Sequence, residues 1–374
     1  MKKFVVFILL MFIFSLNVFA EEKKYSILME YSTGKILMDE NSLEKRAPAS
    51  MTKIMTLLLI MEKIDQGKIK LTDEVTISEN ASNMGGSQVF LQPGEVIKVE
   101  DLIKSICISS ANDSAVAMAE YVGGSVEKFV DMMNKKAKEL DLKNTNFVNV
   151  HGLDDDSHYS CPYDMAIMAR ELIKHENILK YTSTYEEYFK KNDGSSVWMV
   201  NTNKLIRHYK GLDGLKTGFT DTAGYCLTAT AKRNGMRLIS VVMGSNTSEN
   251  RSKSTVELMD YGFNNYKLNT IYNKNIKLGK VKVLNGKKDY VDLKLVSDVV
   301  DLTTILEESK YDYKMNIDEI KAPVSVGDVV GKLTLFKDGK KIDTFDITVK
   351  ESIKKANILD YYKKNFRYII SGNV

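Results

Sequence analysis

Cysteine and histidine are scarce in this sequence. Its 374 residues include three cysteines (Cys107, Cys161 and Cys226) and four histidines. An odd cysteine count excludes a complete disulfide framework. One disulfide is the alternative, and we expect three small buried thiols. His151 and His158 flank a run of three aspartates, but neither has a zinc-like spacing to a second histidine or cysteine. The sequence therefore predicts no metal site.

A strong excess of either charge is also missing. The chain carries 53 Lys and Arg against 49 Asp and Glu, a formal net charge of +4. Loss of Lys2 and Lys3 with a cleaved leader would leave +2, from 51 basic and 49 acidic residues. This balance is too weak to indicate a nucleic-acid partner. With 44% hydrophobic and 27% charged residues, the composition is that of an ordinary folded protein.

The N-terminal apolar run is too short to span a bilayer comfortably. It extends from Phe4 to Leu16 and follows two lysines. Small residues end at Ala20, and a polar segment begins directly after it. These features predict a secretory signal peptide, residues 1–20, cleaved after Ala20. An uncleaved anchor is the alternative. Export would place the protein at the outer face of the cytoplasmic membrane, in the cell envelope. A self-sufficient hydrolase or a binding protein is favoured there, because ATP and nicotinamide are not reliably supplied.

Hydrophobic periodicity divides the rest of the chain. Residues 21–265 combine early strands, helical stretches and late strands, which predicts an α+β domain with helices inserted between strands of one antiparallel sheet. The expected elements are a hairpin at 25–38, helices starting at Ser50 and at 101–122, 125–140, 162–175 and 249–263, and strands at 212–219, 225–231 and 236–243. Residues 266–350 alternate polar and apolar side chains, which predicts a small all-β domain for spacing or interaction.

The C-terminal segment, residues 351–374, returns to helical periodicity. It has a local charge of +3, from five basic and two acidic residues. A basic amphipathic helix at a terminus favours association with an anionic membrane surface, and a helix docked on its own domain is the alternative. The apolar side is formed by Ile358, Leu359, Tyr362, Phe366, Ile369 and Ile370.

Three short motifs carry the candidate chemistry, and the first is Ser50-Met51-Thr52-Lys53. S-x-x-K occurs five times in the chain, but only Ser50 clearly begins a strongly apolar helix. The spacing puts Ser50 and Lys53 on one helical face. The helix start also offers free backbone N–H groups. Burial in such a helix lowers the pKa of a lysine, so a neutral Lys53 can accept the serine proton.

The other two motifs are Ser110-Ala111-Asn112 and Lys216-Thr217-Gly218. The first falls inside the predicted helix 101–122, where apolar neighbours leave its polar side chains either linking helices or facing a cleft. The second lies on a predicted strand and is the one K-T-G in the chain. A lysine and a threonine side by side suit a carboxylate ligand. We expect Gly218 to let a substrate backbone approach closely.

Together these motifs resemble the serine penicillin-recognising enzymes. Residues 47–53, 149–154, 213–220 and 223–225 are similar to the low-molecular-mass D-Ala-D-Ala carboxypeptidases, peptidase family S11. The resemblance covers roughly residues 24–265, and the β domain and tail extend it. It implies a β-lactamase/transpeptidase-like domain that removes the terminal D-alanine from peptidoglycan stem peptides through an acyl-enzyme. It also implies that the reaction needs no cofactor and that β-lactams would inhibit the enzyme.

The resemblance also implies a role for each motif residue. Ser50 would be the nucleophile and Lys53 its general base, while Ser110 would relay protons. The remaining implied ligands are Asn112 for the substrate amide, Lys216 and Thr217 for the terminal carboxylate, and the backbone N–H groups of Ser50 and Phe219, beside Gly218, for the oxyanion.

Three alternatives stay open. A D,D-endopeptidase would use the same residues. A class A β-lactamase would need a glutamate loop, and no E-x-x-x-N segment lies between Asn112 and Lys216. Ala111, where β-lactamases often carry Asp, also favours the carboxypeptidase. A non-catalytic peptidoglycan-binding protein would not need Ser50 and Lys53 together. The sequence does not indicate an oligomeric state.

Overall fold

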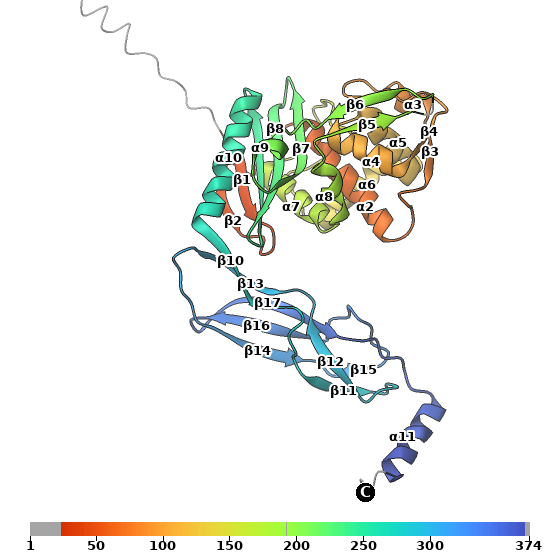
Figure 1. The fold of residues 1–374 in the computed structure, drawn as a ribbon, viewed down its shortest axis with the longest axis vertical. Coiled ribbons are helices and arrows are strands. Elements are labelled where there is room, and N and C mark those ends of the chain that lie inside the picture. The colour runs from red at the N-terminus through yellow and green to blue at the C-terminus, as the bar shows by residue number, and fades with distance from the viewer. Residues whose placement is uncertain (1–23, 192, 371–374) are drawn as a thin grey trace, which may run out of the picture. The chain divides into compact units, whose positions relative to one another are not determined.

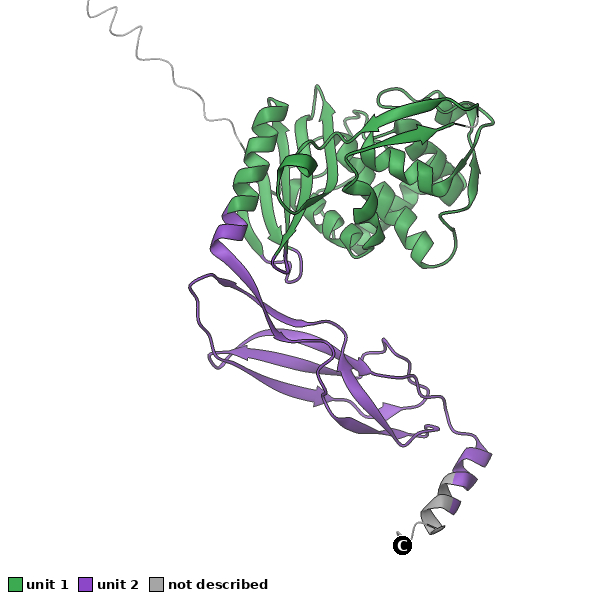
Figure 2. Cartoon of the chain, viewed as in Figure 1, with its two compact units in different colours: residues 1–30, 36–233, 237–260 green, residues 31–35, 234–236, 261–374 purple. Residues whose placement is uncertain are grey.

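The computed structural model describes residues 24–191 and 193–370, so the predicted signal peptide lies outside the described residues. The chain forms two compact units (Figure 2). Of the described residues, unit 1 contains those of 24–30, 36–233 and 237–260. Unit 2 begins at Tyr261 and also contains two short turns, residues 31–35 and 234–236.

A five-stranded sheet is the framework of unit 1. Its strand order is β2-β1-β9-β8-β7, so β7 is an edge strand. β1 pairs antiparallel with β2 and β9, and β7 pairs antiparallel with β8. Asn234 and Gly235, both with positive φ, form the predicted hairpin turn between β8 and β9. The strands are β1 (Tyr25–Glu30), β2 (Ile36–Glu40), β7 (Leu212–Thr220), β8 (Gly224–Arg233) and β9 (Met236–Ser245).

Helices lie on both sides of this sheet. In Figure 1, α10 lies on one side and a group formed by α2, α4, α5 and α6 lies on the other. The chain order of early strands, helices and late strands confirms the predicted α+β arrangement. The helices of unit 1 are η1 (Ala49–Thr52, a 3₁₀ turn), α2 (Lys53–Asp65), α3 (Glu79–Ser82), α4 (Val99–Ile108), α5 (Asn112–Gly123), α6 (Val126–Glu139), α7 (Pro162–Ile173), α8 (Asn177–Thr182), α9 (Leu205–His208) and α10 (Ser248–Asn265).

The prediction of one helix over residues 101–122 is wrong. The structure has two helices, α4 and α5, separated by Ser109–Ala111. Ser110 has a φ of 64°, in the left-handed region. The backbone N–H of Asn112 leaves the helical ladder and donates to the Ser87 carbonyl at 2.7 Å. Hydrophobic periodicity did not reveal this break, because both helices bury apolar residues. The hydrogen bond that accompanies the break is to a residue distant in sequence, so it leaves no local pattern.

Two small two-stranded sheets of unit 1 were also not predicted. β3 (Glu74–Thr76) pairs with β4 (Val96–Lys98), and β5 (Glu186–Lys190) pairs with β6 (Ser196–Val200). Both are short and largely exposed, so their periodic signal is weak. The segment that follows β6 leads into β7 and supplies a side chain to the site.

Unit 2 is the predicted all-β domain. A six-stranded sheet has the order β14-β16-β17-β12-β11-β15, and β10 pairs with β13. Its core consists of buried Val, Leu, Ile and Phe side chains from these strands. The elements are β10 (Tyr266–Tyr272), β11 (Lys280–Leu284), β12 (Tyr290–Leu295), β13 (Val299–Thr304), β14 (Tyr311–Ile317), β15 (Ile320–Lys321), β16 (Gly331–Lys337), β17 (Lys340–Val349) and α11 (Ile358–Ile370).

All three cysteines are buried and free, as predicted. Burial raises the pKa of the Cys107 and Cys161 thiols to about 12 and that of Cys226 to about 11, which keeps them protonated and unreactive. Over the residues that the structure describes, no helix combines the length and the apolar character needed to cross a bilayer.

Candidate active site

Ser50 and Lys53 meet at the start of the central helix of unit 1. Ala49, with a φ of 47°, turns the chain into η1, and Lys53 is the first residue of α2. Lys53 Nζ lies 2.9 Å from Ser50 Oγ. The S-x-x-K spacing thus brings the two side chains into hydrogen-bond contact.

Lys53 is completely buried, and two further oxygens contact its amine. Lys53 Nζ lies 2.6 Å from Asn112 Oδ1 and 2.9 Å from the His151 carbonyl. Burial lowers the pKa of Lys53 well below its usual value, and the nearby charge of Lys216 lowers it further, whereas Asp113 opposes the shift. These conditions favour a neutral amine.

The second motif lies where α4 and α5 are separated. Ser110 is buried, and its hydroxyl has no hydrogen-bond partner among the described residues. Asn112 is the first residue of α5, and its Nδ2 donates to the Gly85 carbonyl at 2.7 Å. After the break, the two ends of the Asn112 amide point in different directions. Its Oδ1 contacts Lys53, and its Nδ2 contacts the 85–91 loop.

Asp113 holds that loop in place, and the sequence analysis did not single it out. Its buried carboxylate accepts backbone hydrogen bonds from Val89 and Leu91, each at 3.1 Å. Burial raises the pKa of Asp113, while these hydrogen bonds oppose the rise. A charged residue next to the Ser110–Asn112 motif, in an otherwise apolar helix, is the sequence signal that would have identified it.

The third motif lies on the edge strand β7. Lys216 is buried, and Thr217 Oγ1 donates to Thr202 Oγ1 at 2.6 Å. Burial lowers the pKa of Lys216 to about 7, and the charge of Arg251 contributes to this decrease. Phe219 is half exposed and stacks on Tyr225, with ring centroids 4.3 Å apart.

Gly218 brings β7 against the serine turn. A Cβ atom at this position would lie 2.8 Å from the Pro48 carbonyl oxygen and 3.2 Å from the Ser50 nitrogen. The structure thus gives a different reason for the glycine from the one we expected. The space that a side chain would take is occupied by the protein's own backbone, and this contact places β7 beside the Ser50 N–H.

Arg251 of α10 is a second residue that the sequence analysis missed. Its guanidinium is largely buried, and its Nε has no hydrogen-bond partner among the described residues. Its charge lowers the pKa of Lys216, so the two cations lie close enough in unit 1 to interact electrostatically. No motif surrounds Arg251 in the sequence, so only the packing of α10 reveals it.

The His151–Gly152 loop closes the site around Lys53. Gly152 has a φ of 92°, and a Cβ atom there would lie 1.8 Å from the Ala49 carbonyl oxygen. His158 Nε2 lies 2.7 Å from Thr52 Oγ1, and its Nδ1 accepts a hydrogen bond from the Val148 N–H. Burial lowers the pKa of both histidines to about 4. Within residues 24–191 and 193–370, no cluster of three His, Cys, Asp or Glu could hold a metal ion.

Comparison with known proteins connects this geometry to a family. A family model for D-alanyl-D-alanine carboxypeptidases matches residues 18–247, and one for the C-terminal domain of penicillin-binding protein 5 matches residues 266–355. The chain belongs to the D-alanyl-D-alanine carboxypeptidase family. It is 48% identical over 348 residues to the D-alanyl-D-alanine carboxypeptidase DacF of Bacillus subtilis (strain 168), covering 92% of this chain and 89% of that protein.

Further relatives of this carboxypeptidase support the assignment. D-alanyl-D-alanine carboxypeptidase DacA of Escherichia coli (strain K12) is 36% identical over 357 residues, which cover 91% of this chain and 87% of that one. Penicillin-binding protein 5 from Haemophilus influenzae superposes with a TM-score of 0.71 and 34% identity, covering 89% and 97% of the two chains. Penicillin-binding protein D2 from Listeria monocytogenes, in an ampicillin-bound form, has a TM-score of 0.58 and 32% identity over 64% of this chain and 96% of that one. Fold and sequence thus agree for both units.

A Ser110→Ala variant separates a role in proton transfer from a role in folding. The Ser110 hydroxyl has no hydrogen-bond partner in the part of the chain that the structure describes, so we expect the melting temperature to change by less than about 2 °C. We expect D-alanine release from a pentapeptide to fall by about 100-fold, because loss of a positioned proton carrier typically costs this much or more. A variant that melts normally and keeps full activity would exclude Ser110 from the chemistry.

The two buried lysines predict a bell-shaped pH dependence of kcat/KM. Activity falls at low pH as Lys53 becomes protonated, and it falls above about pH 7 as Lys216 loses its charge in the free enzyme. A bound carboxylate raises the pKa of Lys216, so the alkaline limb of kcat should lie at higher pH than that of kcat/KM. In Lys216→Arg the alkaline limb should disappear, because arginine stays charged. The same limb in that variant would contradict the assignment.

Proposed function

We propose that this carboxypeptidase removes the terminal D-alanine from peptidoglycan pentapeptide stems through an acyl-enzyme on Ser50. The observation that carries the proposal is the contact of Ser50 Oγ with the buried amine of Lys53, at 2.9 Å. Membership of the family supports the reaction and its substrate class. The geometry around Lys53 supports the division of roles.

The hydrogen bonds of Lys53 favour a base directed at Ser50. A neutral amine has two N–H donors and one lone pair. Asn112 Oδ1 and the His151 carbonyl can only accept hydrogen bonds, so they take both donors. The lone pair is then left for the Ser50 hydroxyl, which donates to it. This is the arrangement that a general base needs before it takes the serine proton.

Strand β7 supplies the binding groups. Lys216, Thr217 and Arg251 would receive the terminal carboxylate, since a planar anion suits two cations and a hydroxyl. The backbone N–H groups of Ser50 and Phe219 would stabilise the oxyanion, and the close contact at Gly218 brings these two segments together. Loss of one such donor typically costs about 2.7–4 kcal/mol of transition-state stabilisation.

The reaction has two steps. Ser50 Oγ attacks the carbonyl between the two D-alanines while its proton passes to Lys53. The C–N bond then breaks, and the leaving amine takes a proton that Ser110 relays from Lys53. Water next hydrolyses the ester and restores the Ser50 hydroxyl. β-Lactams carry a similar acyl group and would acylate Ser50, as the ampicillin-bound relative supports.

Two measurements test this function. After treatment with benzylpenicillin, mass spectrometry of a digest should find the adduct on Ser50 and none in Ser50→Ala. D-Alanine release from a pentapeptide should be faster than the cleavage of a cross-linked dimer into its two stem peptides, and both should be absent in Ser50→Ala. An adduct on another residue would overturn the assignment of the nucleophile. Cleavage of the dimer alone would show an endopeptidase instead.

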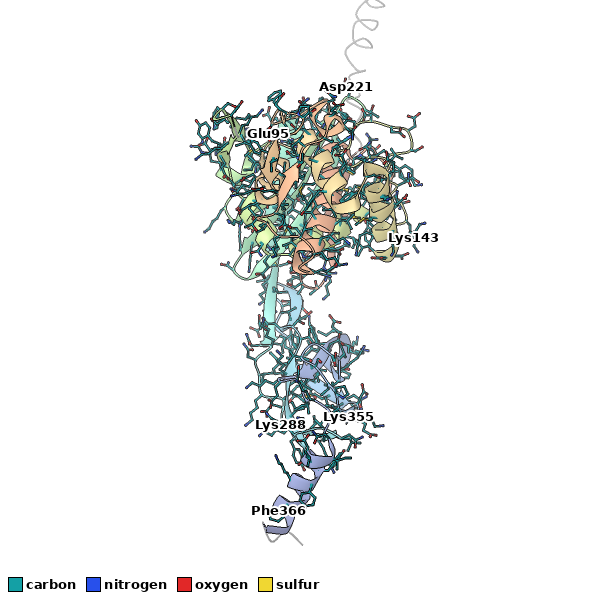
Figure 3. All side chains as sticks on the ribbon, turned by 90° about the vertical axis from the view of Figure 1, so that its right-hand side faces the viewer. Glu95, Lys143, Asp221, Lys288, Lys355 and Phe366 are labelled. Carbon is teal, nitrogen blue, oxygen red and sulfur yellow. The ribbon has the colours of Figure 1, made fainter. Side chains whose placement is uncertain are left out.

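We further propose that the protein is exported and that α11 holds it at the membrane surface. The apolar side chains of α11 whose placement is described are strongly exposed; Ile358 is 87% and Tyr362 is 72% accessible. Lys363 is exposed as well, and Figure 3 labels Phe366 on the same helix. A basic helix with exposed apolar residues suits an anionic lipid surface.

Truncation after Asn357 tests the membrane proposal. This variant keeps Ile353 and Ala356, which are buried in unit 2, so its fold should persist. We expect the full chain to co-sediment with vesicles that contain anionic lipid and the truncated chain to stay in the supernatant. D-Alanine release from a soluble pentapeptide should be the same for both. Equal co-sedimentation of both chains would contradict the proposal.

A further inference from the structure

A cavity of about 470 Å³ opens in unit 1 at the end of β7. Its lining combines both charges: the carboxylates of Asp154, Asp155 and Asp156, and the cationic side chains of Lys45 and Arg46. Thr222, just after β7, also lines it. In Figure 3 the neighbouring Asp221 lies at the surface of the unit, so this end of β7 is reached from solvent.

The cavity lies on the acyl side of the proposed site, and the inference rests on the proposed function. If the substrate carboxylate lies at Lys216 and Thr217 and its carbonyl at Ser50, the rest of the peptide must continue toward Thr220. Since β7 is an edge strand, an extended peptide can add to it in this direction. The Thr220 hydroxyl donates to Asp154 Oδ1 at 2.7 Å, so this path leads directly to the cavity.

The distance from the proposed peptide path to the cavity suits the side chain of the residue that precedes the two D-alanines. Consecutive Cα atoms are about 3.8 Å apart, so the residue before the acylating D-alanine lies one residue further along β7, near Thr220. A side chain of three methylenes and a substituted carbon reaches on the order of 6 Å further. Asp154 lines the cavity and accepts the Thr220 hydroxyl at 2.7 Å, and Thr222, which also lines it, lies in the turn that follows β7. The end of such a side chain would therefore enter the cavity.

Two charged side chains that line the cavity, Asp156 and Lys45, have no ion-pair partner among the described residues. Asp154 is engaged by Thr220, and Asp155 Oδ1 accepts the Ser157 N–H at 2.8 Å. Asp156 makes no hydrogen bond or ion pair with any residue that the structure describes. Lys45 lies over the Tyr159 ring, 4.3 Å from its centroid, and no described carboxylate pairs with it. The cavity thus offers one free anion and one free cation.

We propose that this cavity binds the side-chain end of the diamino acid at the third position of the stem peptide, and that it selects a zwitterionic end. Asp156 receives the ammonium group, and Lys45 receives a carboxylate on the same carbon. meso-Diaminopimelate carries both groups at this place. Lysine carries the ammonium group alone and would leave Lys45 without an anion.

Three pentapeptides that differ only at the third residue test the proposal: meso-diaminopimelate, L-lysine and L-norleucine. The measurement is kcat/KM for D-alanine release. The wild type should prefer diaminopimelate to norleucine by about tenfold or more, with lysine between them. In Lys45→Gln the preference for diaminopimelate over lysine should disappear. In Asp156→Asn the preference of lysine over norleucine should disappear.

Matched controls come from a charged pair elsewhere in unit 1. Asp141 and Lys143 are strongly exposed and form a 3.4 Å ion pair that involves no residue of the cavity. Asp141→Asn and Lys143→Gln make the same chemical changes, so they should keep the wild-type order of the three peptides. Equal kcat/KM values for the three peptides in the wild type, or an unchanged order in both cavity variants, would overturn the proposal.

Two different outcomes distinguish a failure of the cavity proposal from a failure of the proposed function. If Ser50 is acylated by benzylpenicillin and all three peptides release D-alanine at equal rates, the cavity proposal is wrong and the proposed function stands. If no peptide releases D-alanine and Ser50 takes no adduct, the proposed function itself is wrong.

Discussion

The burial of one amine, that of Lys53, is the constraint on which the site depends. A charged ammonium without full compensation in an apolar interior is costly, so the fold favours the neutral form. The apolar helix α2, which provides much of the core of unit 1, therefore also provides the proposed base. Packing and reactivity have the same origin here, because any change that hydrated Lys53 would raise its pKa and remove its lone pair.

Backbone contacts hold the other groups around this amine. The serine turn at Pro48–Ser50 touches Gly152 on one side and Gly218 on the other, and a Cβ atom at either glycine would collide with it. Asp113 fixes the 85–91 loop by accepting its N–H groups. Two segments far apart in the sequence are thus positioned by main-chain atoms, and a third is held by a buried carboxylate. Such contacts are less adjustable than contacts between flexible side chains, which suits a site that must keep its geometry.

The local part of this site could be predicted from the sequence, and the tertiary part could not. The contact between Ser50 and Lys53 follows from a spacing of three at a helix start. The strand that carries Lys216 follows from the alternation of its residues. The break at Ser110 accompanies a hydrogen bond from Asn112 to the Ser87 carbonyl, and the charge of Arg251 acts on Lys216 only because α10 packs beside the sheet. Neither interaction leaves a periodic trace in the chain, and a strong apolar pattern concealed the break.

The two buried lysines have opposite requirements, and their proximity links binding to catalysis. In the proposed mechanism, Lys53 must be neutral to take a proton, whereas Lys216 must be charged to hold an anion. A positive charge lowers the pKa of a neighbouring amine, and Lys216 acts on Lys53 in this sense. Lys216 and Arg251 lie buried without an anion among the described residues, so an arriving carboxylate would stabilise their charged forms. A substrate without a carboxylate next to the scissile bond would leave these cations uncompensated. The need for a free carboxyl group beside the cleaved amide, which the proposed mechanism includes, would therefore follow from the cost of burying unpaired charge.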